Sequence, residues 1–264
     1  MENAKNYFSI SGGSLLLEAR KVPWDSELLG HPVGEIFSLE LRECGDSYRE
    51  FQSFKSWVKD EGYGLISCRL PNKKLSESEL LERNDFRFIE TVLHPEFVNL
   101  QDTHIESCDI LISNAANSDI PIIGDIAARS FGHERFHVDP YLNPENGNLR
   151  YRRWVESSAG SSVQILLKAT LNGKVVGFFL VEYMGRQVYW HLTAIAPELK
   201  GKGLGVRVWK AMMAHHQKDG MHCILTTISA RNVPVLNLYS KLNFRFQPPE
   251  MTFHWVDACN KPMT

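Results

Sequence analysis

The chain has 264 residues and 43% hydrophobic content, which is enough for one large domain or two small ones. Its formal net charge of −2 excludes a bulk electrostatic attraction to nucleic acid or to an anionic membrane. No apolar run is long enough to span a membrane, and the N-terminal stretch "MENAKNYFSI" lacks the apolar core of a signal peptide.

The first predicted elements lie in residues 45–88, where the pattern indicates helix, strand, helix and strand. Apolar residues at helical spacing predict a helix over 47–60, and Gly62 ends it. Residues 63–71 predict the first strand. The hydrophobic pattern lapses at 100–108, so we expect a domain boundary there, with an N-terminal domain over 1–105 and a second domain over 106–264.

The last third of the chain predicts strand, glycine-rich loop, helix, strand, helix and two further strands. The first strand covers residues 188–196, which are apolar and rich in β-branched and aromatic side chains, and Pro197 ends it. Apolar residues at helical spacing follow the loop until Gly220. The remaining elements are a strand at 221–229, a helix at 232–243 and two strands at 244–246 and 251–256.

The loop is "KGKGLG", residues 200–205. A P-loop needs Ser or Thr after its lysine, and a dinucleotide fingerprint needs G-x-G-x-x-G, so the loop is neither. However, a helix begins with unpaired N–H groups and the positive end of its dipole, and glycines let a phosphate approach that backbone. The loop therefore predicts an anion site, with an ordinary helix-capping turn as the alternative that only the flanking motifs decide.

Two segments of the chain resemble each other at a distance of 158 residues (244 − 86). "LLERNDFRF" at 80–88 aligns with "LYSKLNFRF" at 238–246, and Gly62 then aligns with Gly220 without a gap. This predicts a degenerate internal repeat, with chance similarity as the alternative. The glycine loop aligns with "RECGDS" at 42–47, and Tyr239 aligns with Leu81. We therefore expect the N-terminal copy to have lost the anion site, and to extend the sheet and wall an acceptor pocket.

Two motifs in the second half resemble those of the GNAT acyltransferases. Lys200, Gly203 and Gly205 match the family's [Q/R]-x-x-G-x-[G/A] loop, with Lys as a departure from Gln or Arg. A later motif close to N-x-x-A-x-x-L-Y-x-K-x-G-F is matched by Asn232, Val235, Leu238, Tyr239, Lys241, Asn243 and Phe244, where Val and Asn are departures. The resemblance covers about residues 108–258 and implies an α/β (α+β) mixed sheet. It does not explain the first hundred residues, and the internal repeat predicts a smaller, partial GNAT-like domain there.

The resemblance also implies acetyl-CoA as the donor. Its pyrophosphate would bind the loop Lys200, Gly201, Lys202, Gly203, Leu204 and Gly205, and its pantetheine arm would pair with the strand Thr193, Ala194, Ile195 and Ala196. Asn232 and Asn237 are further cofactor candidates, with N-capping of the helix as the alternative for Asn232. Tyr239 would protonate the leaving sulfur, unless it is a core aromatic residue. His191 would accept the proton of the amine, unless it is a packed strand residue.

The stretches 22–36 and 130–157 resemble the sugar-nucleotide N-acetyltransferases of the dTDP-fucosamine type. This narrower resemblance implies a nucleotide-linked amino sugar as the acceptor. Arg135 and His137 are the candidates for binding its diphosphate, because an arginine fork matches phosphate oxygens. Trp24 is a candidate for stacking on the base or sugar, with burial as its alternative. The other arginines of 150–153 are expected on a solvated helix face.

Two other functions remain open at this stage. The chain could acetylate another small amine or a peptide, or it could bind acyl-CoA without catalysis. The five cysteines form no C-x-x-C pair, and His215 and His216 are expected on a solvated helix face, so we expect reduced thiols, a cytoplasmic location and no metal. The acyl length, the sugar and the oligomeric state, including a homodimer, stay open.

Overall fold

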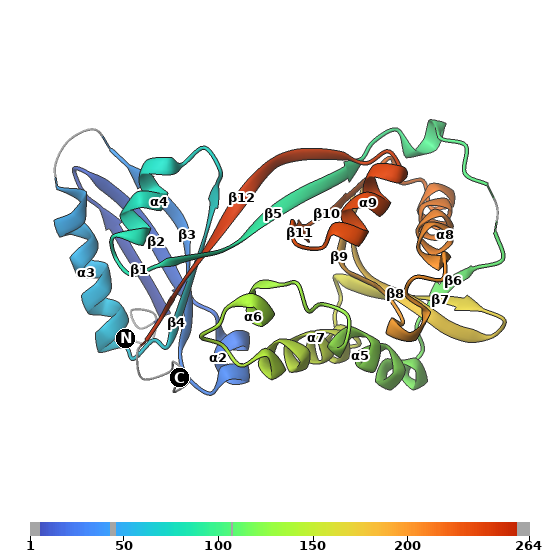
Figure 1. Ribbon diagram of the computed structural model, residues 1–264, viewed down its shortest axis with the longest axis horizontal. Helices are drawn as coiled ribbons and strands as arrows, with labels where there is room; N and C mark the ends of the chain where they lie inside the picture. The colour runs from blue at the N-terminus through green and yellow to red at the C-terminus, as the bar shows by residue number, and fades with distance from the viewer. Residues whose placement is uncertain (1–5, 43–45, 107, 258–264) are drawn as a thin grey trace. The chain divides into compact units, whose positions relative to one another are not determined.

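The structure is a computed structural model that describes residues 6–42, 46–106 and 108–257. The chain forms two compact units: unit 1 contains Met1–Val92, Arg135–Asn146 and Pro248–Thr264, and unit 2 contains Leu93–Glu134 and Gly147–Gln247. Two long strands, β5 (Arg87–Phe97) and β12 (Arg245–Val256), have residues in both units (Figure 1). The division of roles expected at residue 105 stays a prediction.

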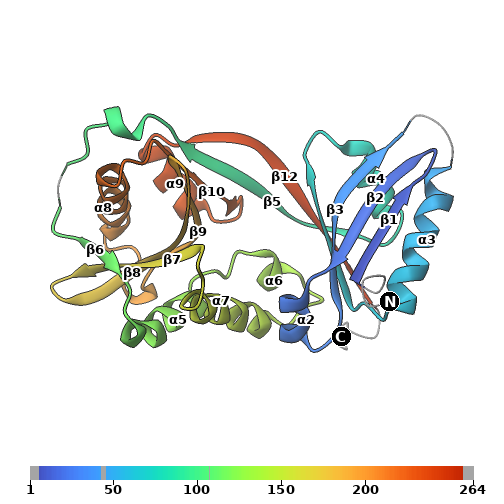
Figure 2. The same cartoon turned by 180° about the vertical axis from the view of Figure 1, so that it is seen from behind.

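Unit 1 is a sheet with helices on both faces. Its strands follow the order β1 (Tyr7–Ser11), β2 (Leu15–Lys21), β3 (Val33–Leu41), β4 (Leu65–Pro71) and β12. Helices α3 (Ser47–Asp60) and α4 (Leu75–Glu82) pack with Ile66 on one face. Helices α2 (Pro23–Leu29) and α6 (Arg135–Val138) pack with Leu65 on the other (Figure 2). Neighbouring strand residues point to opposite faces, so both layers have a core.

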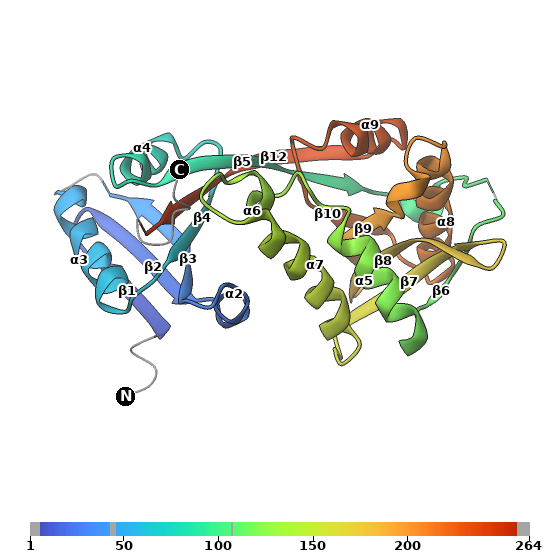
Figure 3. The same ribbon diagram turned by 60° about the horizontal axis from the view of Figure 1, so that its bottom comes forward.

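Unit 2 has the same layered construction around a longer sheet. Its strands follow the order β5, β10 (Cys223–Thr226), β9 (Gln187–Ile195), β8 (Lys174–Met184), β7 (Gln164–Leu171) and β6 (Leu111–Asn114), and β11 (Ile228–Ser229) pairs with β5. Helices α5 (Ile120–Ala128) and α7 (Pro144–Ser158) cover Phe178. Helices α8 (Leu204–Lys218) and α9 (Val233–Lys241) cover the face of Phe179 (Figure 3). Three 3-10 turns, η1 (Leu100–Asp102), η2 (Asn117–Asp119) and η3 (Pro197–Leu199), lie in the connections.

The predicted repeat is confirmed at the level of elements and their order. A shift of 158 residues carries α3, β4, α4 and β5 onto α8, β10 with β11, α9 and β12, with bounds that agree within about one residue. Gly62 and Gly220 both end a helix with positive φ, 68° and 78°. Asp85 and Asn243, which the shift also aligns, have φ of 68° and 62°. The two copies thus share even their left-handed positions.

The register of the strands extends the repeat beyond what the sequence indicated. In both units the last strand comes from the other copy, since β12 pairs with β4 and β5 pairs with β10. The pair Ile66–Trp255 corresponds to the pair Ile224–Phe97 under the same shift. Strands β1, β2 and β3 likewise correspond to β7, β8 and β9, and the register of β2 with β3 and of β8 with β9 contains the same irregularity.

One sequence prediction is wrong: residues 244–246 and 251–256 are not separate strands but parts of the continuous β12. The proline pair Pro248–Pro249 lies between the two predicted strands. Proline is compatible with extended backbone and lacks only the N–H, and the pairing with β4 starts after it, at Glu250. No helix among the described residues has the length and apolar character needed to cross a membrane.

Candidate active site

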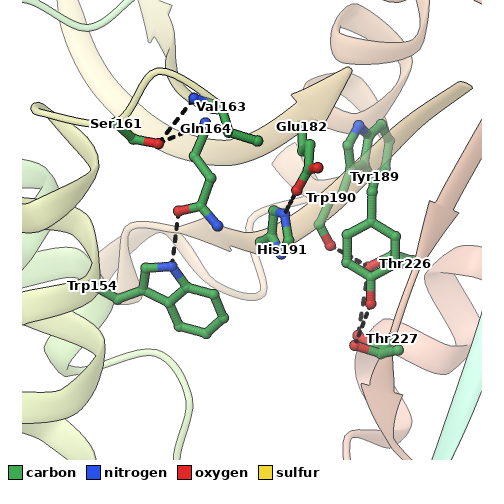
Figure 4. A network of polar contacts seen from close by, with 10 residues as sticks. All are labelled: Trp154, Ser161, Val163, Gln164, Glu182, Tyr189, Trp190, His191, Thr226 and Thr227. Carbon is green, nitrogen blue, oxygen red and sulfur yellow. Dashed lines mark hydrogen bonds and ion pairs between the residues drawn. The ribbon is translucent and has the colours of Figure 1, made fainter. Parts of the chain in front are cut away.

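The central feature of unit 2 is a β-bulge at His191. Leu180 of β8 faces Leu192, whereas Val181 faces Trp190, so His191 is the extra residue of β9. The pairing of β9 with the parallel strand β10 ends at the same place, with Trp190 opposite Thr226. There the Thr226 hydroxyl donates to the Trp190 carbonyl at 2.9 Å (Figure 4). Beyond this point β9 is paired on one edge only.

Backbone alternation identifies the groups on the open edge of β9. The Ala196 N–H donates to the Val176 carbonyl, on the side of β8. In an antiparallel pair the N–H and C=O of one residue point the same way and alternate along the strand. Thr193 and Ile195 therefore direct their N–H and C=O to the open edge, while Ala194 directs them to β8. Of the four strand residues expected to contact the donor, only these two offer backbone groups to it.

The glycine loop leads from β9 into α8 with an uncapped helix start. Gly201 and Gly203 have φ of 75°, and a Cβ at either would meet nothing within 4 Å. Gly203 is the N-cap of α8 and no side chain caps the first turn, so the N–H groups at Leu204 and Gly205 lie at an open helix start. A Cβ at Gly205 would contact Leu238 at 3.6 Å, because α8 packs closely on α9 there.

Tyr239 lies on the α8 and α9 face of the same region. Its side chain is 1% exposed, and its ring packs on Phe244 with centroids 4.8 Å apart. Burial raises the pKa of the Tyr239 phenol, while hydrogen-bonding groups of Trp209, Thr193 and Thr226 act in the opposite direction. The phenol is therefore protonated at neutral pH, beside the point where β9 and β10 part.

His191 lies on the α7 face with a carboxylate partner. Its Nε2 lies 2.9 Å from Glu182 Oε2 of β8. Its ring lies 4.8 Å from that of Tyr189 and 5.9 Å from that of Trp154 of α7. Trp154 Nε1 in turn donates to Gln164 Oε1 of β7 at 3.1 Å (Figure 4). A carboxylate oxygen accepts hydrogen bonds, so this contact favours the tautomer with the hydrogen on Nε2 and an acceptor at Nδ1.

Sequence reasoning missed Glu182 because it considered each strand alone. A signal was present in the turn between β8 and β9, where Gly185 has φ of 62°. A hairpin closed there sets Glu182 opposite Tyr189. The bulge that brings His191 into reach has no marker in the sequence.

The remaining predicted residues fall in different places. Asn232 is the N-cap of α9 but makes no side-chain cap bond, so its amide is not used as a cap, and Asn237 is exposed on the same helix. Arg135 and His137 on α6, and Trp24 on α2, belong to unit 1 and not to the unit that holds the glycine loop. Their role as acceptor contacts stays a prediction.

The expected solvated face at the histidine pair is wrong for His216, which is fully buried. Trp190 Nε1 donates to His216 Nε2 at 3.0 Å, so the ring proton is on Nδ1, 3.2 Å from the Tyr183 hydroxyl. Burial lowers the pKa of His216 to about 3, with a smaller effect of His215. His215, His216 and Asp219 lie close enough to hold a metal ion, but both nitrogens of His216 already have partners.

Comparison with known proteins agrees with this geometry. Residues 125–244 match the model of the Acetyltransferase (GNAT) family. A mycothiol acetyltransferase of Pseudarthrobacter chlorophenolicus is 31% identical over 39% of this chain, but the match spans only 34% of that relative, about a third of its length. A solved GCN5-related N-acetyltransferase from Sphaerobacter thermophilus has a TM-score of 0.66 at 12% identity, covering 96% of this chain and 82% of that one.

A second solved structure resembles both copies at once. A tandem GNAT protein from the clavulanic acid biosynthesis pathway covers 97% of this chain and 82% of its own, with a TM-score of 0.57 at 11% identity. This likeness concerns the fold alone. The family match over residues 125–244, the bulged strand and the glycine loop agree with this likeness, so this part of the chain is similar to the GNAT acetyltransferases.

Proposed function

We propose that this chain is an N-acetyltransferase that moves an acetyl group from acetyl-CoA to the amine of a small molecule. The observation that carries the proposal is the opening of β9 beside the glycine loop, with Tyr239 on one face and the His191–Glu182 pair on the other. Members of the GNAT family use acetyl-CoA and act on small-molecule amines.

The residues of unit 2 fit the donor. The uncapped start of α8 offers N–H groups to a pyrophosphate, and the open left-handed glycines let it approach. The unpaired edge at Thr193 and Ile195 offers backbone N–H and C=O groups to the pantetheine arm of the donor, which contains amides. The Asn232 side-chain amide does not cap α9 and can bind the same arm. Acetyl-CoA, when bound, supplies the acetyl group as a thioester.

The two titratable groups have complementary tasks. His191 Nδ1 accepts the proton of the attacking amine, and Glu182 holds the ring and stabilises the charge that develops on it. Tyr239 keeps its proton at neutral pH and is able to donate it to the departing sulfur. A sugar amine with a pKa of about 8 is partly neutral already, so a modest base suffices.

For the acceptor, the support is the resemblance of the sequence and the aromatic side chains beside His191. An amino sugar is the first candidate, because the sequence resembles sugar-nucleotide N-acetyltransferases, and a nucleotide carrier is the finer form of that proposal. Trp154 and Tyr189 beside His191 are flat surfaces of the kind that pack against a sugar ring.

Release of free thiol from acetyl-CoA tests the proposal. The panel contains a free amino sugar, its dTDP- and UDP-linked forms, an amino acid and a short peptide. We expect thiol release that requires an amine and is fastest with one of the amino sugars. Binding of coenzyme A by calorimetry without thiol release on any amine would favour the non-catalytic alternative, and preference for the peptide would overturn the acceptor class.

A further inference from the structure

Unit 1 repeats the frame of the donor site, including its two irregular features. The register of β2 with β3 sets Glu18 opposite Ser38 and Ala19 opposite Ile36, so Phe37 is a bulged residue equivalent to His191. The pairing of β3 with β4 ends at Ile36 opposite Cys68, as that of β9 with β10 ends at Trp190 opposite Thr226. β3 therefore also has an edge that no strand of the described residues covers.

The equivalent backbone groups are on that edge. Arg42 N–H donates to the Ser14 carbonyl, which corresponds to the bond from Ala196 to Val176. By the same alternation, Leu39 and Leu41 direct their N–H and C=O away from β2, as Thr193 and Ile195 do in unit 2.

In unit 1, however, side chains of the chain itself already bind these groups. Lys74 Nζ donates to the Leu39 carbonyl at 2.6 Å, and the Leu41 N–H donates to Glu77 Oε1 at 3.3 Å. The two side chains are 24% and 14% exposed and lie 3.9 Å apart as an ion pair. Lys74 is the N-cap of α4, at the position that Asn232 has on α9.

The helix start of unit 1 is occupied as well. The Asp46 carboxylate caps α3 by accepting from the Arg49 N–H at 3.0 Å, whereas α8 has no side-chain cap. The carboxylate supplies the negative charge that a phosphate would bring to such a helix start.

We propose that unit 1 contains a second site of the donor-binding type, closed by ligand-like side chains of the chain itself: Asp46 takes the place of a phosphate, and Lys74 and Glu77 take the place of the amide groups of a bound arm. The comparison with acetyl-CoA rests on the function proposed above. The closure itself rests only on the hydrogen bonds of unit 1.

The first experiment tests the closure without any donor. Amide exchange of Leu41 is measured by NMR in the full chain for Glu77→Ala and for Glu77→Gln, which keeps an acceptor oxygen. We expect about tenfold faster exchange in the Ala variant, the factor for loss of about 1.4 kcal/mol, and a much smaller change in the Gln variant. Unchanged exchange at Leu41 in Glu77→Ala would overturn the proposal.

The second experiment introduces the equivalents of Lys74 and Glu77 into unit 2. Asn232→Lys with Val235→Glu sets the same pair at the equivalent positions, 158 residues on. We expect the Ile195 amide to be protected in the free protein and coenzyme A affinity to fall at least about tenfold. The matched control, Asn232→Glu with Val235→Lys, has the same added charges in the wrong order, and we expect no protection of Ile195.

The two outcomes separate the proposals. Equal protection of Ile195 by both double variants, or by neither, would refute the ligand-like closure. If the unmodified chain binds no coenzyme A, the proposed function fails, while the exchange of Leu41 and Ile195 still decides the closure.

Discussion

At the scale of single residues, the proposed acid Tyr239 and the proposed base His191 lie on opposite sides of β9. Tyr239 belongs to the core under α8 and α9, and His191 lies with Trp154 on the α7 face. The bulge makes this possible, since it reverses the alternation of β9: Trp190 faces α8, but Leu192 faces α5 and α7. In the proposed reaction, His191 acts on the attacking amine and Tyr239 acts on the leaving sulfur, from opposite sides of β9.

Replacing Tyr239 with Phe should lower kcat while leaving the dissociation constant for acetyl-CoA nearly unchanged. The ring and its packing on Phe244 survive, and only an interaction that grows with charge on sulfur is lost. We expect a loss of about 100-fold, at the low end for positioned proton donors, because a thiolate leaves tolerably without help. Steady-state kinetics and calorimetry measure the two quantities, and full kcat in the variant would remove the role.

The buried His216 should make the fold sensitive to acid. Its pKa is about 3 in the folded protein and about 6.5 when unfolded, so between these values the unfolded state binds a proton that the folded state does not. The unfolding free energy should fall as pH drops from 6.5, by up to about 1.4 kcal/mol per pH unit. His254, whose pKa burial lowers to about 4, acts in the same direction.

Urea unfolding of the native chain and of His216→Gln between pH 4.5 and 7 measures this contribution. The Gln side chain keeps an acceptor for Trp190 Nε1 and a donor for Tyr183 but has no proton to gain. We expect a shallower fall of stability with acid in the variant. Identical slopes would mean that His216 does not titrate differently on unfolding.

At the scale of elements, the proposed donor site depends on the backbone conformation of the loop between β9 and α8. Both left-handed glycines face open space, so their conformation rather than their small volume is what the loop requires. The shorter N-terminal loop shows the contrast, because its helix begins at a carboxylate cap instead.

Gly203→Asp should weaken coenzyme A binding by more than 100-fold, about 2.7 kcal/mol, because a carboxylate would stand at the helix start that we propose as the pyrophosphate site. Gly203→Asn is the matched control. It has nearly the same shape and tolerates positive φ but has no charge. Calorimetry with coenzyme A should show a much smaller loss for Asn, and equal losses would assign the effect to backbone strain.

At the scale of the whole molecule, the chain is two copies of one arrangement that have diverged in what fills their open strand edge. The C-terminal copy has β6, α5 and α7 before its first hairpin; β6 extends the sheet beside β7, and α5 and α7 pack on the sheet face where His191 lies. The open strand edge of the C-terminal copy thus lies beside α5 and α7, while the edge of the N-terminal copy is bonded by its own lysine and glutamate.

The whole chain should therefore bind one donor molecule, not two. Titration calorimetry with acetyl-CoA or coenzyme A, at a protein concentration well above the dissociation constant, should give a stoichiometry near one per chain. Gly203→Asp should abolish that single event. A second site of similar affinity that survives this substitution would place donor binding in unit 1 as well.

Local residue patterns determined the elements of the two repeated stretches, α3 to β5 and β9 to β12, and their repetition. The helix ends at Gly62 and Gly220 depend on short segments of the chain, and so does the glycine loop. The sequence was therefore sufficient to predict them. The same holds for the shift of 158 residues, which needs no gap between α3 and β5. Tyr239 came from a motif of the resembled family, and His191 from its place on the strand before the loop.

Only the tertiary structure decided which strands pair with each other and where a strand edge stays unpaired. The transfer of β5 and β12 between the copies depends on pairing of distant strands, and the bulges at Phe37 and His191 depend on register, neither of which is encoded in neighbouring residues. Glu182 reaches His191, and Lys74 reaches Leu39, only after the strands are paired. Contacts of this kind are long-range in the chain but short in space, because a sheet brings together residues that the sequence separates.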